Sequence, residues 1–160
     1  MMINNHDEIS EVFFQNNGET DLLTGSIAPN LFNQLVQRDI NLSKRNNASL
    51  SLISLNLNLT KILNEFKEPN LKVTLENQLI TIYFELKKFF RNSDCICRIS
   101  QLGFWILVTG LDEDSSEKIL NRLANTLPNF INISISHRGQ GQELIDWYSE
   151  VDLIHFKSIN

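Results

Sequence analysis

Residues 97–110, CRISQLGFWILVTG, constrain the fold most strongly, because they predict two strands joined by a tight turn. The second strand, FWILVT, is apolar on both of its faces. A strand of that kind is covered on both sides, so we expect it in the middle of a sheet. The turn, SQLG, contains no acid, base or nucleophile. The hairpin tip is a usual place for functional groups, but here it carries no side chain suited to catalysis.

Helical and strand patterns alternate along the rest of the chain. Apolar residues at helical spacing mark five segments, which are 28–46, 59–68, 71–91, 112–127 and 142–157. In the fourth of these segments, Asp114 with Glu117 three residues later predicts the helix cap. Strand patterns mark 48–58 and 130–136 in addition to the hairpin. Strands interleaved with helices in one short chain indicate an α+β domain, in which helices cover a single sheet.

Length and charge narrow the class of protein. The 160 residues have the usual size of one domain, and residues 1–20 are polar and Asn-rich, which predicts a tail or connector before a domain over 21–160. The net charge of −5 gives no bulk attraction to nucleic acid or to an anionic membrane. No apolar run approaches the roughly 20 residues that span a bilayer. The N-terminus also lacks a signal-peptide pattern. We therefore expect a cytoplasmic protein with no membrane insertion and no nucleic-acid partner.

The two cysteines, Cys95 and Cys97, stand two apart in a predicted strand, so both point to the same face. Neighbouring thiols on one strand are poorly placed for a relaxed disulfide. A metal or redox site would show Cys-x-x-Cys or nearby histidine partners. We expect reduced, partly buried thiols, and we expect no cofactor.

Three strings, in order and at matching spacing, resemble the GGDEF domain family, whose members make cyclic di-GMP from two GTP. DLLTGSIAPNLF is similar to the family's opening motif and retains five of its residues, which are Asp21, Leu23, Thr24, Gly25 and Phe32. LNLNLTKILNE retains Lys61 and Asn64. RNSDCICRISQLGF retains Arg91, Asp94, Arg98 and Phe104. The resemblance covers roughly residues 21–157 and implies a nucleotide-cyclase/GGDEF-like fold: a central mixed, mainly antiparallel five-stranded sheet flanked by helices.

The resemblance also implies that the catalytic signature is degenerate. The four positions before Phe104 in the signature carry Ser100, Gln101, Leu102 and Gly103. Asn56 stands where active members have the first magnesium-binding aspartate. Magnesium requires hard oxygen ligands, usually carboxylates and phosphates, and it neutralises phosphate charge during phosphoryl transfer. The family's guanine-contacting acid falls near Val73. We therefore expect no metal site and no diguanylate cyclase activity.

Arg91 and Asp94 match the family's R-x-x-D site for cyclic di-GMP, five residues before the signature. An arginine can grip phosphate with two hydrogen bonds or stack on guanine, and a carboxylate can accept guanine N–H groups. The same residues also have a purely structural interpretation, because basic residues stabilise helix C-termini and aspartate is common in turns. The site usually needs a second arginine, and the sequence offers four candidates, which are Arg38, Arg45, Arg98 and Arg138.

Two further interpretations stay open. Lys61 and Asn64 could make residual nucleotide contacts, or they could be a solvated lysine and a capping asparagine. The domain could instead bind a protein partner or form a homodimer, through an apolar hairpin tip at Leu102 or through an exposed Trp147 or Tyr148. The sequence thus predicts a non-catalytic module of a bacterial regulator in cyclic di-GMP signalling. The alternative is a protein-interaction or dimerisation module that binds no nucleotide.

Overall fold

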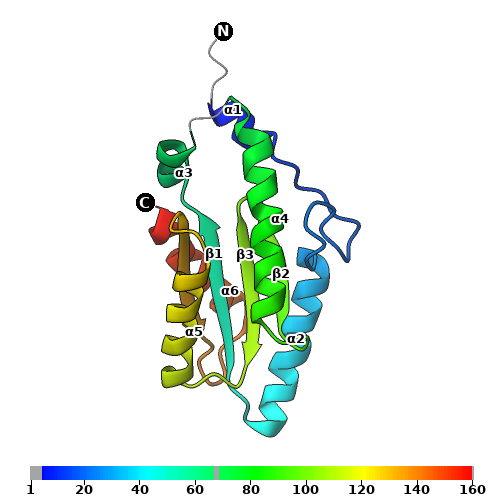
Figure 1. Ribbon diagram of the computed structural model, residues 1–160. Helices are drawn as coiled ribbons and strands as arrows, with labels where there is room; N and C mark the ends of the chain where they lie inside the picture. The colour runs from blue at the N-terminus through cyan, green and yellow to red at the C-terminus, as the bar shows by residue number, and fades with distance from the viewer. Residues whose placement is uncertain (1–4, 67–68, 160) are drawn as a thin grey trace.

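The computed structural model describes residues 5–66 and 69–159 (Figure 1). In chain order its elements are α1 (Asn5–Ser10), α2 (Pro29–Asn46), β1 (Leu50–Leu57), α3 (Leu59–Glu65), α4 (Leu71–Phe89), β2 (Cys95–Ser100), β3 (Gly103–Thr109), α5 (Glu113–Thr126), β4 (Ile131–His137) and α6 (Leu144–Ile159). Within the described residues, the segments that the sequence marks as helical or extended form the expected kind of element. Residues 67 and 68, the end of the helix predicted over 59–68, lie outside the described residues. None of the helices in the described ranges combines the length and the apolar character that crossing a bilayer takes.

The strands form one sheet in the order β2-β3-β1-β4, and each neighbouring pair is antiparallel. Strand β3 lies between β2 and β1, so the prediction that FWILVT is central is confirmed. Helices α4 and α5 cover one face of the sheet, and α2 and α6 cover the other (Figure 1). Both faces of the central strands are therefore buried, which explains their nearly unbroken apolar sequence.

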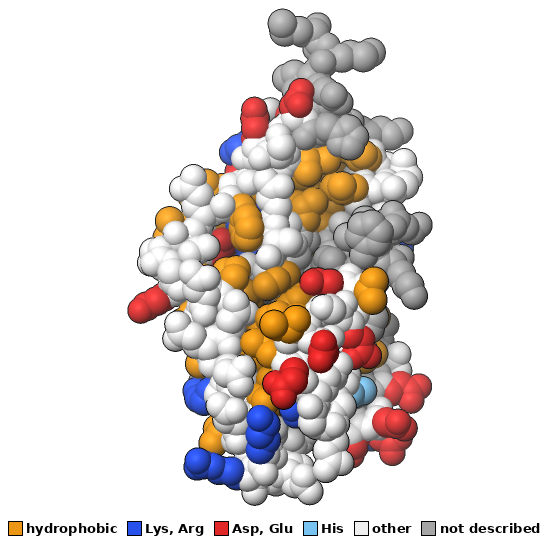
Figure 2. Space-filling view, turned by 180° about the vertical axis from the view of Figure 1, so that it is seen from behind, with side chains coloured by type: hydrophobic (Ala, Val, Ile, Leu, Met, Phe, Trp, Pro, Cys, Tyr) orange, Lys and Arg blue, Asp and Glu red, His pale blue; other side chains and the backbone are white. Residues whose placement is uncertain are grey.

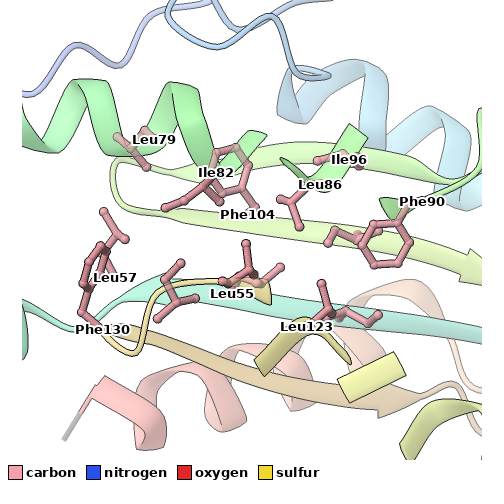
Figure 3. Close-up of a cluster of buried hydrophobic side chains, with 14 of the residues drawn as sticks. Leu55, Leu57, Leu79, Ile82, Leu86, Phe90, Ile96, Phe104, Leu123 and Phe130 are labelled. Atoms are coloured by element: carbon pink, nitrogen blue, oxygen red, sulfur yellow. The ribbon is translucent and has the colours of Figure 1, made fainter. Parts of the chain in front are cut away.

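Alternation along the central strands divides the core into two clusters. In β3, Phe104 and Ile106 face α4, whereas Trp105 faces α2 and α6. Figure 3 shows the first cluster, in which side chains of α4, such as Leu86, meet those of β1 and α5. Burying each large apolar side chain contributes about 1.5–3 kcal/mol, so this packing fixes where the loops at the ends of the strands lie.

The prediction of a mixed, five-stranded sheet is wrong, because the described residues form four strands that all pair antiparallel. A short parallel contact lies where a fifth strand would run along β2. The Ile27 N–H donates to Ile96 O at 2.9 Å, and the Arg98 N–H donates to Ile27 O at 3.2 Å. Pairing stops after this single residue because α2 begins at Pro29.

The cap of α5 also differs from the prediction. Asp112, rather than Asp114, is the N-cap, and its carboxylate accepts the Ser115 N–H at 2.7 Å. This hydrogen bond is the main reason why the pKa of Asp112 lies below its usual value. Asp114 lies inside the first turn, where an acid still complements the helix dipole.

The two cysteines and two tryptophans lie in the interior. Cys95 and Cys97 lie on the same, α2 and α6 side of the sheet, as the sequence predicts, but they are buried rather than partly buried. Burial raises the pKa of the Cys97 thiol. Trp105 is 3% exposed and Trp147 is 0% exposed. Tyr148 is half-buried and donates its hydroxyl to Asn33 Oδ1 at 2.9 Å. The idea that Trp147 is exposed at a partner surface is therefore wrong, whereas Tyr148 keeps part of its surface exposed.

The N-terminal stretch packs on the rest of the fold. Helix α1 contacts α4, and Val12 is 2% exposed within the core. The Phe13 N–H donates to the Glu76 carboxylate at 2.8 Å. The boundary at residue 21 between a connector and the domain stays a prediction.

Candidate functional site

The hairpin tip carries the residues that the resemblance places in the degenerate signature. The amide of Gln101 donates to Ser10 O and to Val12 O, each at 3.0 Å. Leu102 is half-buried against the core, and its carbonyl accepts the Leu57 N–H at 2.9 Å. The tip thus holds the N-terminal stretch in place and does not present an exposed apolar patch.

Of the other signature positions, Gly103 and Phe104 are buried and Ser100 is partly buried. Ser100 pairs with Gly103 at the turn. Phe104 is 2% exposed, and its ring stacks on Tyr83 with 6.4 Å between the centroids. These positions close the end of the hairpin against α4.

The space beneath the tip does not fit a magnesium ion. It leaves no room for a water molecule, and it is lined by Leu55, Asn56, Leu57, Ile82, Leu102, Phe104 and Ile131. Asn56 is 4% exposed and lies opposite Gly103 in the sheet. Asn56 could offer one neutral amide oxygen, whereas Leu102 and Gly103 have no side-chain oxygen. Hard cations prefer carboxylates, so this donor set is unsuited to Mg²⁺.

Arg98 is one of the four candidates for a second arginine, but its side chain is buried and contacts other residues of the protein. It forms an ion pair with Asp21 in which Nη1 lies 3.2 Å from Oδ1. Its Nη2 donates to Gln101 O at 2.8 Å, and the ring of Phe14 lies 4.9 Å from its guanidinium carbon. Burial lowers the pKa of Arg98, although Asp21 opposes that effect. A side chain that is 0% exposed cannot meet a ligand at the surface, which excludes this candidate.

Arg91 and Asp94 lie together in the turn between α4 and β2. The Arg91 N–H donates to Asp94 Oδ2, and the Asp94 N–H donates to Arg91 O, both at 3.0 Å. The carboxylate therefore shapes the turn, as the structural interpretation of the motif predicts. The same turn also places both residues at the edge of a pocket of about 250 Å³.

The pocket brings together side chains of several chemical kinds. It is lined by Ile27, Tyr83, Lys87, Phe90, Arg91, Asn92, Asp94 and Ile96. None of the other three candidate arginines, Arg38, Arg45 and Arg138, lines it. Among the described residues, Arg91 and Lys87 are in no ion pair, so both cations remain available to an anion. Lys88 instead lies 3.6 Å from the Glu85 carboxylate and over the ring of Phe84.

Burial shifts the pKa of two of the groups that line this pocket. It raises the pKa of Asp94, while the Arg91 N–H and the Arg91 charge act in the opposite direction. It also raises the pKa of Tyr83, whose hydroxyl donates to Gly25 O at 3.3 Å. The Lys87 ammonium lies 5.7 Å from the centre of the Tyr83 ring. Aromatic, cationic and anionic groups thus converge on one hollow.

Sequence reasoning missed Tyr83 and Asn92 in this pocket. Tyr83 stands four residues before Lys87 and eight before Arg91, so helical spacing could have placed it on the same face. Asn92 follows the helix in an irregular turn, where no periodic signal exists.

Lys61 and Asn64 lie on α3, away from this pocket. The Lys61 ammonium donates to Asn129 O at 3.3 Å, and Asn64 is exposed. The asparagine that caps α3 is Asn58, whose side chain accepts the Lys61 N–H at 3.2 Å. The structure does not bring Lys61 or Asn64 to Arg91. A role for either in binding a nucleotide stays a prediction.

No protein-family model matches the chain, and no curated protein matches its sequence. Solved structures do match its fold. The GGDEF domain of DgcB from Caulobacter crescentus, in complex with c-di-GMP, has a TM-score of 0.75 and 10% identity over 91% of this chain and 92% of that one. Diguanylate cyclase SiaD from Pseudomonas aeruginosa, in complex with its activator SiaC, has a TM-score of 0.73 and 16% identity over 87% of this chain.

The chain spans 57% of the SiaD chain. The GGDEF domain of FimX from Pseudomonas aeruginosa has a TM-score of 0.66 and 13% identity over 82% of this chain and 90% of that one. Identities this low establish the backbone arrangement only. On that evidence, the chain has the fold of a GGDEF domain.

Proposed function

We propose that this protein is a non-catalytic, GGDEF-like signalling module that binds cyclic di-GMP in the pocket around Arg91 and Asp94. The observation that carries the proposal is the convergence of Tyr83, Lys87, Arg91 and Asp94 on one hollow. Arg91 and Lys87 suit the ligand's phosphates, because arginine can grip a phosphate with two hydrogen bonds. The Tyr83 ring offers a stacking surface, and the Asp94 carboxylate can accept guanine N–H groups. The complex of DgcB with c-di-GMP agrees with this ligand class.

The size of the pocket indicates how much of the ligand it takes. Pockets that enclose a drug-sized molecule usually measure roughly 300–1,000 Å³. The volume here, about 250 Å³, suits one guanine and a neighbouring phosphate. The remainder of the ligand would lie on the surface or against a second protein molecule.

Loss of catalysis is supported by the chemistry beneath the hairpin tip. Cyclase chemistry needs metal ions that neutralise phosphate charge in the transition state. Asn56, Leu102 and Gly103 provide one neutral oxygen in place of carboxylates, and the surrounding side chains fill the space. The proposal is therefore that any ligand binds at Arg91 and that no product forms at the tip.

Calorimetric titration with cyclic di-GMP tests the receptor role. Saturable heat is expected for the unaltered chain, and Arg91→Ala should abolish it. Lys88→Ala is the matched control, since Lys88 stands three residues away and faces Glu85. Absence of heat in the unaltered chain at high micromolar ligand would refute the receptor role. Incubation with GTP and magnesium tests catalysis separately, and detection of cyclic dinucleotide would refute the proposed inactivity.

A protein-binding role is the second candidate, and one surface feature favours it. Val73, Ile80 and Phe84 of α4 are 51%, 42% and 59% exposed, and their spacing places them on one side of the helix. Exposed apolar side chains that line up in this way are typical of interaction surfaces. Diguanylate cyclase SiaD, which contains this fold, forms a complex with its activator SiaC. Light scattering over a range of concentrations, with Phe84→Ser as the variant, would show whether this row supports a homodimer.

A further inference from the structure

A second cavity lies at the end of the sheet where β1 begins. It is a pocket partly open to solvent, and the C-terminal end of α2, the start of β1 and the loop after β4 line it. Its volume is about 490 Å³, roughly twice that of the pocket around Arg91. Small-molecule sites usually fall in this range, roughly 300–1,000 Å³. The proposed function makes no use of this cavity.

The lining of this cavity is cationic. Lys44 and Arg138 line it, together with neutral polar residues such as Asn47 and Gln140, and none of its lining residues is acidic. Neither Lys44 nor Arg138 forms an ion pair within the described ranges. The C-terminal end of α2 lies at the bottom of Figure 1, and in Figure 2 several lysine and arginine side chains lie at the same end, with acidic side chains beside them. The net charge of the chain is −5, so a pocket lined by cations and by no acid is a candidate site for an anion.

Arg138 is held in position by two hydrogen bonds. Its backbone N–H donates to Leu50 O at 2.9 Å, and its Nε donates to Gln142 O at 2.9 Å. The backbone of Gln142 is itself held in a turn, because its N–H donates to Gly139 O at 3.0 Å and its Oε1 accepts the Gly139 N–H at 2.9 Å. The bond from Nε orients the guanidinium and leaves its two Nη groups for a ligand. An oriented guanidinium loses less entropy when it binds a phosphate.

Helix stabilisation explains only part of this arrangement. Lys44 and Arg45 lie in the last turn of α2, where cations offset the negative end of the helix dipole. Arg138 belongs to no helix, because it follows β4. The dipole also does not explain why a cavity lies between Lys44 and Arg138.

We propose that this cavity is an anion site that takes a phosphate group, either as free phosphate or as part of a nucleotide. Arginine and lysine together are the usual side chains for phosphate, the arginine through its fork of donors and the lysine as a compact charge. Asn47 and Gln140 supply neutral donors at the same hollow. This site is separate from the proposed cyclic di-GMP pocket and does not depend on it.

NMR titration of the full chain with inorganic phosphate tests the proposal, against sodium chloride at equal ionic strength. Backbone amides of residues 47–50 and 138–141 should shift and saturate. Arg138→Gln and Lys44→Gln should each weaken binding about tenfold, as expected for losing one charge-assisted hydrogen bond. Lys118→Gln, an equal charge change at an exposed lysine of α5, should leave the affinity unchanged.

The outcomes separate the sources of the phosphate. A much higher affinity for metal-free GTP than for inorganic phosphate would show that the site takes the phosphate as part of a nucleotide. Lys44→Gln remains informative if Arg138→Gln disturbs the loop, because Lys44 is exposed. The absence of a saturable shift up to tens of millimolar phosphate would overturn the proposal, as would equal affinity in all three variants. A failed cyclic di-GMP titration would not affect it, because Arg91 lines a different pocket, which shares no lining residue with this one.

Discussion

The guanidinium of Arg98 lies 3.2 Å from the carboxylate of Asp21, and the two side chains are 0% and 1% exposed. The pair joins segments that are 77 residues apart. The Thr24 N–H and hydroxyl also donate to Asp21, at 2.9 and 2.7 Å. A charged pair removed from water is favourable only while both partners and their hydrogen bonds are present. The loop before α2 and the hairpin therefore depend on each other.

Replacing one member of this pair should strongly destabilise the fold. Arg98→Met leaves the Asp21 carboxylate buried without its cation, which typically costs about 3–5 kcal/mol. Urea unfolding followed by circular dichroism measures the loss. Arg38→Met is the control, because Arg38 pairs with Asp39 while its side chain is 56% exposed. Exposed pairs contribute under about 1 kcal/mol, so equal losses in the two variants would contradict the role assigned to Arg98.

The sequence predicted the order and type of the helices and strands better than the number of strands and the position of a helix cap. Periodicity located the long helices and the central position of β3, because those patterns follow directly from burial. It did not predict the strand count, because Ile27 pairs with β2 for one residue only before Pro29 begins α2. It also chose Asp114 as the cap, because Asp112 and Asp114 precede the same apolar pattern and only the backbone geometry distinguishes them.

Removing the Gln101 amide should release the N-terminal stretch. Gln101→Ala deletes the two hydrogen bonds to Ser10 O and Val12 O, each typically worth about 0.5–1.5 kcal/mol. Hydrogen exchange at residues 10–14 should become faster, while exchange in β1 and β3 should change little. Gln37→Ala, on the exposed side of α2, is the matched control. Unchanged exchange in Gln101→Ala would mean that packing of Val12 alone holds this stretch.

Replacement of the α5 cap should reduce stability in a pH-dependent way. The folded pKa of Asp112 is depressed by the Ser115 N–H, so its contribution is fully present above the unfolded pKa and is lost as pH falls through the folded one. Asp112→Ala should therefore unfold at lower urea concentration than the unaltered chain at pH 7, and the difference should shrink in strong acid. Asp114→Ala tests the cap that the sequence predicted. A larger effect from Asp114→Ala would contradict the capping geometry.

The candidate site was partly predictable for a physical reason. Arg91, Asp94 and Lys87 are close in sequence, so a helix end and a short turn suffice to bring them together. The fate of Arg98 was not predictable, because its partner Asp21 comes from a distant segment. The role of Gln101 was not predictable either, because its amide donates to the backbone of the N-terminal stretch, which is distant in sequence.

Two neighbouring lysines should respond differently to cyclic di-GMP. Lys87 lines the pocket with Arg91, whereas Lys88 contacts Glu85 and Phe84. Lys87→Ala should weaken binding roughly tenfold, the usual effect of losing one charge-assisted hydrogen bond, and Lys88→Ala should leave it nearly unchanged. Calorimetry of both variants beside the unaltered chain provides the comparison, and equal losses would mean that general charge attracts the ligand.

The same titration should depend on pH through Asp94. Burial raises the folded pKa of this carboxyl group, so it takes up a proton at a higher pH than an ordinary aspartate does. The protonated form no longer accepts two guanine N–H groups, so affinity should fall as pH is lowered through this raised pKa. Asp94→Asn, which keeps the shape without the charge, should bind weakly at every pH and lose this dependence. If the unaltered chain and Asp94→Asn show the same pH profile, the carboxylate only shapes the turn and does not bind the base.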